Sequence, residues 1–514
     1  MSSRYYITTA IDYANGDPHF GHAYEKIGAD AIARYRRLRG DQVYFLIGMD
    51  EHGQKVAQAA EARGIPPQQL VDELAANFRA MWERLGVSHD QFWRTTDPRH
   101  AAGVHALIER LAAHNPTDLY EHEYEGLYCV GCEQFKRDAE IVDGACPLHP
   151  TRQLEWTKER NWFFRLTRYT DFLRGLIQRP GFIEPASRRN EMLSLLDQGL
   201  EDISVTRARL SWAIPFPKPL ATGETQGTWV WFDALPNYLT ATGFPGAGYD
   251  TRWPAQLHVI GKDIVRLHTI IWPAMLEAAG LPLPERVWGH GWLSFGGERF
   301  SKSAGVKVEL QDAVDHHGPD AFRYFLLREI PWDGDGNFTW ERFDERYTAD
   351  LADGLGNLVS RVLAMLERYR DGVVPQAGEP TGLDHRATEI LTAYAREMEA
   401  LLLHRAAQAA WELVSEANVY VDRRAPWTQA KTGDHAGLDV TLAALARALV
   451  RLAVLVHPFM PGTADAIWRA LMGGGAFAPN GAWAHAEQPR VEGVKTFRIP
   501  PLFPKPVPES GHKR

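Results

Sequence analysis

AIDYANGDPHFGH occupies residues 10–22 and follows RYYITT, a strand-like run of β-branched and aromatic residues at 4–9. Its Gly, Pro and Asn residues predict a loop, and apolar side chains then recur at helical spacing as far as Leu38. QVYFLIGMDEHG, at 42–53, predicts a second buried strand that ends in a polar loop. Strand, loop, helix and strand in this order form a βαβ unit, for which a parallel sheet with a right-handed crossover is expected. Because ligands of such sheets bind beyond the carboxyl ends of the strands, both polar loops mark the expected functional edge.

Length and composition indicate a folded chain of several domains. The 514 residues, at roughly 150 per domain, predict about three domains. Hydrophobic residues at 45% and charged residues at 24% exclude a largely disordered or collagen-like chain. No stretch approaches about 18 uncharged apolar residues and the first residues lack a signal-peptide apolar run, so we expect no membrane span, no export and a cytosolic location. A net charge of −9 argues against a generally basic protein, although a local basic face can still contact RNA.

The cysteines predict a metal site. All three lie between Cys129 and Cys146, and an odd number cannot form a disulfide framework. The pattern Cys129-x2-Cys132-x13-Cys146-x2-His149 presents three thiolates and an imidazole on two short clips, which suits tetrahedral zinc. Four protein ligands leave no open coordination position, so we expect a single structural Zn²⁺. The alternative is a set of buried free thiols, which a reducing cytosol permits.

The strand-rich pattern returns downstream, which indicates a sheet divided by an insertion. TWVWFDAL, LHVIGKD and VWGHGWLSF form a second α/β pattern between residues 228 and 295, and long helical segments dominate after about Glu341. The predicted fold is therefore α/β: a split Rossmann-type parallel-sheet catalytic domain with an inserted zinc-knuckle connective domain, followed by an α-helical bundle. The expected boundaries are 1–116 and 213–295 for the two catalytic halves, 117–212 for the connective domain, 296–345 for a loop region, 346–480 for the helical domain and 481–514 for an extended Pro-rich tail.

His19-Phe20-Gly21-His22 stands where the first loop enters the first helix. Two imidazoles three residues apart share a helix face, and Gly21 lets a phosphate approach backbone N–H groups at the positive end of the helix. The alternative is a pair of ordinary helix-start histidines. From the residues alone, the chain is a nucleotide-using α/β enzyme with a zinc knuckle.

HFGH resembles the H-I-G-H signature of class I aminoacyl-tRNA synthetases, and RFSKS at 299–303 resembles their K-M-S-K-S signature. AIDYANGDPHFGH, GMDEHG, VWFDAL, IGKD, NLVSR and RRAPW are similar, in the same order, to segments of the methionyl-tRNA synthetase family, so the resemblance covers nearly the whole chain. It implies that 296–345 is the signature-loop region and 346–480 the anticodon-binding domain. The implied activity is methionine–tRNA ligation: L-methionine and ATP with Mg²⁺ give methionyl-adenylate and pyrophosphate, and methionine is then transferred to the 3′ end of its tRNA, including the initiator tRNA.

The resemblance also implies site residues by position. The implied catalytic residues are His19, His22 and Lys302. The implied ATP-binding residues are His19, Gly21, His22, Gly261, Asp263, Ser301, Lys302 and Ser303. The implied methionine-binding residues are Ile11, Tyr13, Asp50, Trp231, Ala234, Tyr238 and His290. The implied anticodon-binding residues are Asn357, Arg361 and Trp427. A strand-end carboxylate such as Asp50 suits an ammonium ion, aromatic walls with a hydroxyl–imidazole pair suit a thioether, and an exposed indole suits an unpaired base.

This chain departs from the family pattern at several positions. Arg299 and Phe300 replace the first Lys and the Met of the signature, and since Arg is not equivalent to Lys, the essential cation is expected to be Lys302. Leu235 stands where some members carry Pro, and Asp12 stands where Pro or another residue is common.

Three alternatives remain beside this interpretation. Synthetases for leucine, isoleucine or valine usually carry a large editing insertion, whereas 117–212 is short and largely accounted for by the knuckle. Cysteinyl enzymes use zinc in the active site, which a closed four-ligand knuckle disfavours. From a different class, a catalytically inactive relative would only bind RNA. The chain has no room after the bundle for the C-terminal tRNA-binding and dimerisation module of some relatives, so a monomer is expected.

Overall fold

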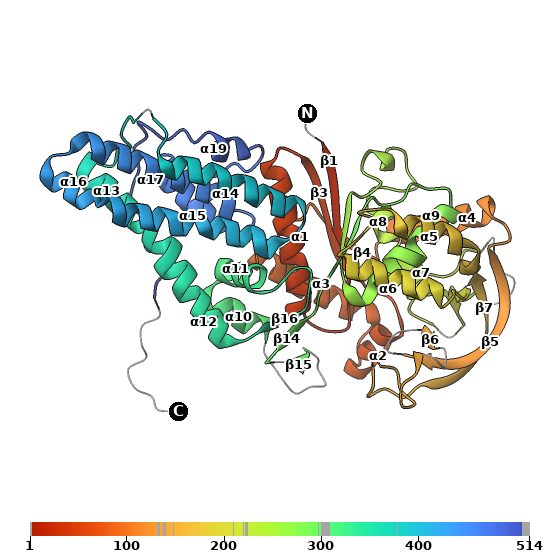
Figure 1. Ribbon diagram of the computed structural model, residues 1–514. Coiled ribbons are helices and arrows are strands. Elements are labelled where there is room, and N and C mark those ends of the chain that lie inside the picture. The colour runs from red at the N-terminus through yellow and green to blue at the C-terminus, as the bar shows by residue number, and fades with distance from the viewer. Residues whose placement is uncertain are drawn as a thin grey trace, which may run out of the picture.

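The computed structural model describes residues 3–130, 134–136, 140–147, 149–208, 210–218, 220, 225–296, 298–299, 309–377 and 379–505. Cys132, Phe300, Ser301, Lys302 and Ser303 lie outside the described residues, as does the side chain of Arg299. Figure 1 shows a sheet at the centre of the chain, with a helical bundle on one side and a smaller β-structure on the other.

A seven-stranded sheet has the strand order β2-β3-β1-β12-β13-β8, with β4 also paired to β3. Every pair in it is parallel. The strands are β1 (Arg4–Thr9), β2 (Asp12–Tyr13), β3 (Gln42–Asp50), β4 (Gln91–Arg94), β8 (Ile183–Glu184), β12 (Leu257–Gly261) and β13 (Val287–His290). The predicted split, Rossmann-type parallel sheet is confirmed, because β1 lies between β3 and β12, which are more than 200 residues apart in the chain.

The βαβ unit forms as its sequence predicts. Helix α1 (Phe20–Leu38) connects β1 to β3, and most buried positions of the two strands are apolar, whereas Thr8, Thr9 and Asp50 are buried polar residues at their carboxyl ends. Gly40, at φ +90°, makes the turn after α1 that L-residues with a Cβ rarely adopt. The carboxyl ends of β1, β3, β12 and β13 consequently meet at one edge, beside the first turn of α1.

The inserted block contains a four-stranded antiparallel sheet in the order β6-β5-β7-β9. Its strands are β5 (Leu119–Cys129), β6 (Gln134–Lys136), β7 (Glu155–Phe164) and β9 (Ile203–Ser204). The same block contains α5 (Thr170–Gln178) and α6 (Ala186–Asp197), and between them β8 pairs with β13 of the catalytic sheet. The residues 117–212 therefore supply an edge strand to the catalytic sheet as well as the connective β-structure.

Short helices and strands surround the catalytic sheet. They are α2 (Gln54–Arg63), α3 (Pro67–Arg84), α4 (Pro98–His114), β10 (Thr206–Arg207), β11 (Gly227–Thr228), α7 (Val230–Ala234), α8 (Asn237–Thr240), α9 (Trp272–Ala278), β14 (Leu293–Phe295), β15 (Glu298–Arg299), α10 (Leu310–His317), α11 (Pro319–Glu329) and β16 (Gly336–Phe338). A π-helical turn, Leu267–Ile271, leads into α9.

The C-terminal part is helical. It comprises α12 (Trp340–Arg346), a π-helical segment Tyr347–Gly356, α13 (Asn357–Arg370), α14 (Gly382–Glu399), α15 (Leu403–Arg424), α16 (Pro426–Thr432), α17 (His435–Val456), α18 (Pro461–Leu471) and α19 (Trp483–Glu487). The tail packs against the bundle through two buried aromatic residues: Trp483 stacks on Tyr394, and Phe503 meets Tyr347 edge-on. Among the described helices, none combines the length and apolarity needed to cross a bilayer.

One hydrophobic core joins the bundle to the catalytic domain. It runs from α1 and α3 through α11 into α13–α18 without interruption, while a second core fills the other face of the sheet under α4, α5 and α7–α9. Figure 1 shows α1 lying between the sheet and the bundle. The helix that begins with HFGH is thus packed rigidly against the C-terminal domain.

Candidate functional site

The first turn of α1 fixes the two signature histidines. His19 caps the helix: its Nδ1 accepts the backbone N–H groups of Gly21 at 3.1 Å and His22 at 3.4 Å. The two imidazoles stack with centroids 3.6 Å apart and an interplanar angle of 18°. An Nδ1 that accepts a backbone N–H leaves Nε2 as the protonated donor of the neutral ring. The cap therefore places an N–H donor at the positive end of α1, where an anion is favoured.

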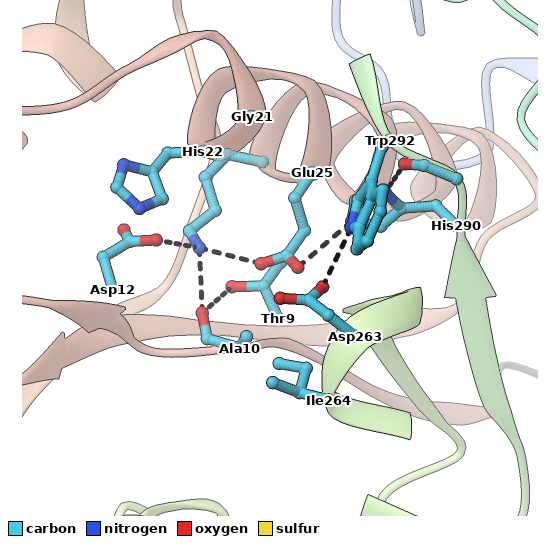
Figure 2. Close-up of polar contacts among 12 residues, drawn as sticks. Thr9, Ala10, Asp12, Gly21, His22, Glu25, Asp263, Ile264, His290 and Trp292 are labelled. Carbon is cyan, nitrogen blue, oxygen red and sulfur yellow. Dashed lines mark hydrogen bonds and ion pairs between the residues drawn. The ribbon is translucent and has the colours of Figure 1, made fainter. Parts of the chain in front are cut away.

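A buried charge network follows one turn later. Lys26 is fully buried, and its Nζ donates to Asp12 Oδ1 at 2.6 Å, Glu25 Oε1 at 3.0 Å and the Ala10 carbonyl at 2.8 Å. Figure 2 shows Asp12, Ala10 and Glu25 converging beneath the signature residues. Burial raises the pKa of Asp12 to about 7, although Lys26 acts against it. Burial alone would also raise the pKa of Glu25, but Lys26 and then His290 outweigh it and hold that pKa below its ordinary value.

His290 lies on the far side of this network from Lys26. Its Nε2 is 3.2 Å from Glu25 Oε2, its Nδ1 is 2.8 Å from the Gly291 carbonyl, and its ring stacks on Trp332 at 5.2 Å. Trp332 in turn packs onto α1 so closely that a Cβ at Gly28 would lie 2.0 Å from its ring. His290 is therefore held by α1 rather than by the side chains of the predicted methionine pocket.

The predicted nucleotide residues at the end of β12 form a separate polar cluster. The Trp292 indole N–H donates to Asp263 Oδ1 at 3.3 Å, which Figure 2 shows. Lys262 lies 4.1 Å from the centre of the Trp292 ring and 2.6 Å from Asp335. Gly261, the last residue of β12, precedes this cluster, and a Cβ on it would lie 2.7 Å from Asp263 Oδ1. The glycine keeps open the approach to a carboxylate suited to accept hydroxyl groups.

A hydroxyl–imidazole pair lies in the buried pocket, but its imidazole is His268. The Tyr238 hydroxyl is 2.7 Å from His268 Nε2, and His268 Nδ1 is 2.9 Å from the Ile264 carbonyl. A carbonyl only accepts, so Nδ1 carries the proton and Nε2 accepts from the tyrosine. Burial lowers the pKa of His268 to about 4, while burial and then the charge of Glu25 raise that of Tyr238, so both groups are neutral near pH 7. His268 is not among the predicted residues; its position five residues beyond Asp263, past the carboxyl end of β12, was the available signal.

The other predicted pocket residues come from the same edge. Asp50 ends β3 and is buried, and its carbonyl accepts the N–H of Ala14 at 2.9 Å. Ile11 covers Gly48 of β3, where a Cβ would lie 3.0 Å from its Cγ2. The remaining members are Tyr13, Trp231, Ala234 and Tyr238; Tyr13 and Trp231 are partly exposed, and Ala234 and Tyr238 are buried.

Helix α7, which carries Trp231 and Ala234, is tied to β3 by a buried acid. Asp233 accepts from His52 Nδ1 at 2.7 Å and from His100 Nε2 at 2.9 Å. Burial disfavours the charged carboxylate, but His52 and His100 together lower the pKa of Asp233. His52 lies two residues after Asp50, so this network fixes one pocket wall relative to the predicted ammonium-binding carboxylate.

Three knuckle residues converge at the carboxyl end of β5. Cys129 Sγ is 3.9 Å and Cys146 Sγ is 4.0 Å from His149 Nδ1, and both cysteines are buried. In a tetrahedral zinc site with ordinary bond lengths, sulfur and nitrogen ligands lie about 3.5 Å apart. These donors fit a zinc ion with a contraction of a few tenths of an ångström.

The predicted anticodon residues lie together at the distal end of the bundle. Asn357 is the first residue of α13 and is exposed, and Arg361 follows one turn later. The Arg361 guanidinium lies over the ring of Trp427 at 5.9 Å and pairs with Asp422 at 2.8 Å. Trp427, on α16, is 47% exposed, so a broad aromatic face is open to solvent beside a cation.

Comparison with known families accounts for both parts of the chain. A family model described as tRNA synthetases class I (M) matches residues 5–155 and 150–363, and one described as the anticodon binding domain of methionyl tRNA ligase matches residues 374–505. The chain belongs to the methionyl-tRNA synthetase family.

Individual members of the methionyl-tRNA synthetase family match over nearly the whole chain. The methionine–tRNA ligase of Caldanaerobacter subterraneus subsp. tengcongensis is 42% identical over 480 residues, which cover 92% of this chain and 74% of that protein. That of Mesorhizobium japonicum is 41% identical over 518 residues, 99% of both chains. Mycobacterium tuberculosis methionyl-tRNA synthetase in complex with methionyl-adenylate is 39% identical, with a TM-score of 0.90 over 98% of this chain and 100% of that one.

Proposed function

We propose that this chain activates L-methionine with ATP and transfers it to the 3′ end of elongator and initiator methionine tRNAs. Membership of the methionyl-tRNA synthetase family supports the reaction. One observation supports the assignment of the site. At one edge of the sheet lie a helix start suited to an anion, a carboxylate at the end of a strand and the neutral Tyr238–His268 pair.

The first step joins the methionine carboxylate to the α-phosphate of ATP, and the bond from that phosphate to pyrophosphate breaks. Asp50 holds the ammonium group, and Ile11, Tyr13, Trp231, Ala234, Tyr238 and His290 enclose the amino acid with His268. The Nε2–H groups of His19 and His22 and the amides of the first turn, from Gly21, donate to phosphate oxygens as negative charge redistributes. Lys302, Ser301 and Ser303 bind the triphosphate, Gly261 and Asp263 bind the ribose, and Mg²⁺ brought with ATP supplies charge neutralisation.

The second step joins a terminal ribose hydroxyl of the tRNA to the adenylate carbonyl and releases AMP. Neither step needs a protein nucleophile, so the residues contribute positioning and charge stabilisation. At the other end of the chain, Trp427 stacks with an unpaired anticodon base while Asn357 and Arg361 hydrogen-bond to base edges.

The knuckle holds one structural zinc ion in this proposal. Cys129, Cys132, Cys146 and His149 are the ligands, and the first, third and fourth already converge. Four ligands give the ion a structural role in the connective domain. We also propose the following division of the chain: catalytic halves 1–116 and 213–295, connective domain 117–212, signature-loop region 296–345, anticodon-binding domain 346–480 and tail 481–514. A cytoplasmic monomer is proposed as well.

Amino-acid-dependent ATP–pyrophosphate exchange tests the proposal. With purified chain and Mg²⁺, exchange with methionine alone among the twenty amino acids, followed by charging of methionine tRNA, is expected. Exchange with another amino acid refutes the pocket assignment, and no exchange favours an inactive RNA-binding relative. Lys302→Ala is expected to slow exchange while sparing methionine binding, and Lys307→Ala is the matched control in the same segment; equal loss of both functions in Lys302→Ala contradicts its role.

A further inference from the structure

Two adjacent histidines and a carboxylate converge at the end of α10, away from the knuckle. His316 and His317 are the last two residues of α10, and Asp344 lies on α12. The Nε2 atoms of both imidazoles are 2.7 Å from the same Oδ1 of Asp344. One ligand atom from each of the three residues lies within 4.8 Å of the others.

The two rings are oriented by packing rather than left to rotate. His317 stacks on Tyr347 with centroids 3.8 Å apart and an angle of 7°, and it meets Phe343 edge-on at 5.0 Å. His316 meets Trp340 edge-on at 5.0 Å. Fixed rings lose little conformational freedom when they ligate an ion, so the set is preorganised.

The donor types favour a particular class of ion. Two imidazole nitrogens and one carboxylate oxygen suit Zn²⁺ and neighbouring divalent transition metals, whereas Ca²⁺ and Mg²⁺ prefer all-oxygen sites.

A cavity opens beside the donors. Its volume is about 920 Å³, and its walls include His316, His317 and Asp344 together with Asp320 and Thr463. Three protein ligands leave a position for water or an exogenous ligand, which this cavity can admit.

We propose that His316, His317 and Asp344 bind a divalent transition-metal ion of the Zn²⁺ class, at a site separate from the cysteine knuckle. Binding replaces two Nε2–H···O hydrogen bonds by two Nε2–metal bonds, and each ring then carries its proton on Nδ1. The ion joins the end of α10 to α12, and α10 begins at Leu310, shortly after the signature segment 299–303. The site does not depend on the proposed catalytic function.

Metal stoichiometry and cobalt spectra test the site in the full chain. After equilibration with Zn²⁺ and removal of free ion, we expect two bound equivalents in the native chain and one in Asp344→Asn and in the double variant His316→Gln/His317→Gln. His385→Gln, which alters an exposed histidine on α14, is the matched control and should retain both. With Co²⁺, the first equivalent should show intense thiolate-to-cobalt absorption that Cys146→Ser removes, and the second only weak visible bands that Cys146→Ser leaves in place.

A thermal measurement gives a second readout. With the knuckle loaded, added Zn²⁺ should raise the melting temperature of the native chain and of His385→Gln, but not that of Asp344→Asn, because an ion that binds only the folded state stabilises it. Retention of every bound equivalent of the native chain in Asp344→Asn and in the double variant would overturn the proposal, whether the native chain binds one equivalent or two. The hydrogen bonds to Asp344 would then be purely structural.

Discussion

Replacement of Tyr238 by Phe isolates the role of the buried hydroxyl–imidazole pair. The substitution removes one oxygen and leaves the aromatic wall in place. Because His268 Nδ1 donates to the Ile264 carbonyl at 2.9 Å, its Nε2 depends on the Tyr238 hydroxyl, 2.7 Å away, for a proton donor. Both residues are fully buried, at 1% exposure each, so water does not readily replace the lost donor.

The expected magnitude follows from the cost of an unpaired buried acceptor. Leaving such a group without its partner costs about 1–3 kcal/mol. In the proposed site the methionine sulfur packs against this pair. A free-energy loss of the same size then lowers methionine affinity by about 5- to 150-fold, at 1.4 kcal/mol per factor of ten. The methionine KM should rise accordingly, while kcat should fall less, because the pair lies away from the reacting carboxylate and phosphate.

Methionine-dependent ATP–pyrophosphate exchange measures both parameters. Tyr394→Phe is the matched control, since the Tyr394 hydroxyl is equally buried and donates to the Leu455 carbonyl at 2.9 Å, inside the bundle. The control should lose comparable stability and keep its methionine KM. An unchanged KM in Tyr238→Phe, or an equal rise in the control, would refute the placement of the side-chain pocket.

Further predictions concern stability and RNA binding. Lys26→Met leaves two buried carboxylates without their cation and should lower the free energy of unfolding by about 3–5 kcal/mol in urea denaturation; a loss below about 1 kcal/mol would contradict the network. Burial opposes ionisation of Asp384, but hydrogen bonds from its arginine partners hold the pKa of this carboxyl far below the ordinary value. The ionised carboxylate therefore stabilises the fold fully above about pH 4, and this stabilisation is lost as the pH falls through the folded-state pKa. The destabilisation of Asp384→Asn relative to the native chain should therefore be full at pH 7 and should shrink progressively below about pH 4, as the pH falls toward the folded-state pKa; a difference that stays constant over that range would exclude this linkage. Trp427→Ala should lower kcat/KM for tRNA charging by about 5- to 150-fold, because base stacking is lost, and should leave pyrophosphate exchange unchanged. A fall in pyrophosphate exchange as well would show that the residue supports the catalytic domain instead.

Local sequence signals predicted the elements that depend on nearby residues. The alternation of strand-like runs and loops around residues 4–53 fixed the βαβ unit, because its buried positions and its glycine turn are encoded within a short segment. The pairing of β1 with β12 could be predicted from the rule that a second α/β pattern in the chain rejoins the first sheet. The Cys129 to His149 spacing likewise needed no tertiary knowledge, since both clips are local.

Features that depend on distant partners were not predictable in the same way. β8 has only two residues, Ile183–Glu184, and its place in the catalytic sheet rests on pairing with β13, about 100 residues later. Lys26 lies opposite the apolar stripe of its helix, which indicates an exposed position, and only the fold shows that it is buried and that three oxygens satisfy its charge. His268 and His290 are both histidines near strand ends, and the sequence cannot tell which faces Tyr238 and which faces Glu25.

The contrast between these two histidines bears on amino-acid selection. His290 touches a carboxylate whose pKa is held low, whereas burial keeps His268 neutral even though Glu25 and Asp263 both act to raise its pKa. A neutral phenol and a neutral imidazole offer no counter-ion, so a charged side chain would lose its hydration without compensation. Aliphatic side chains meet no such penalty, and rejection of one or two methylene groups supplies only about 1–3 kcal/mol. In the proposed pocket, discrimination of methionine from leucine or norleucine therefore rests on shape and on contact of the sulfur with Tyr238, Trp231 and His268. We expect Tyr238→Phe to lose more selectivity against norleucine than against lysine.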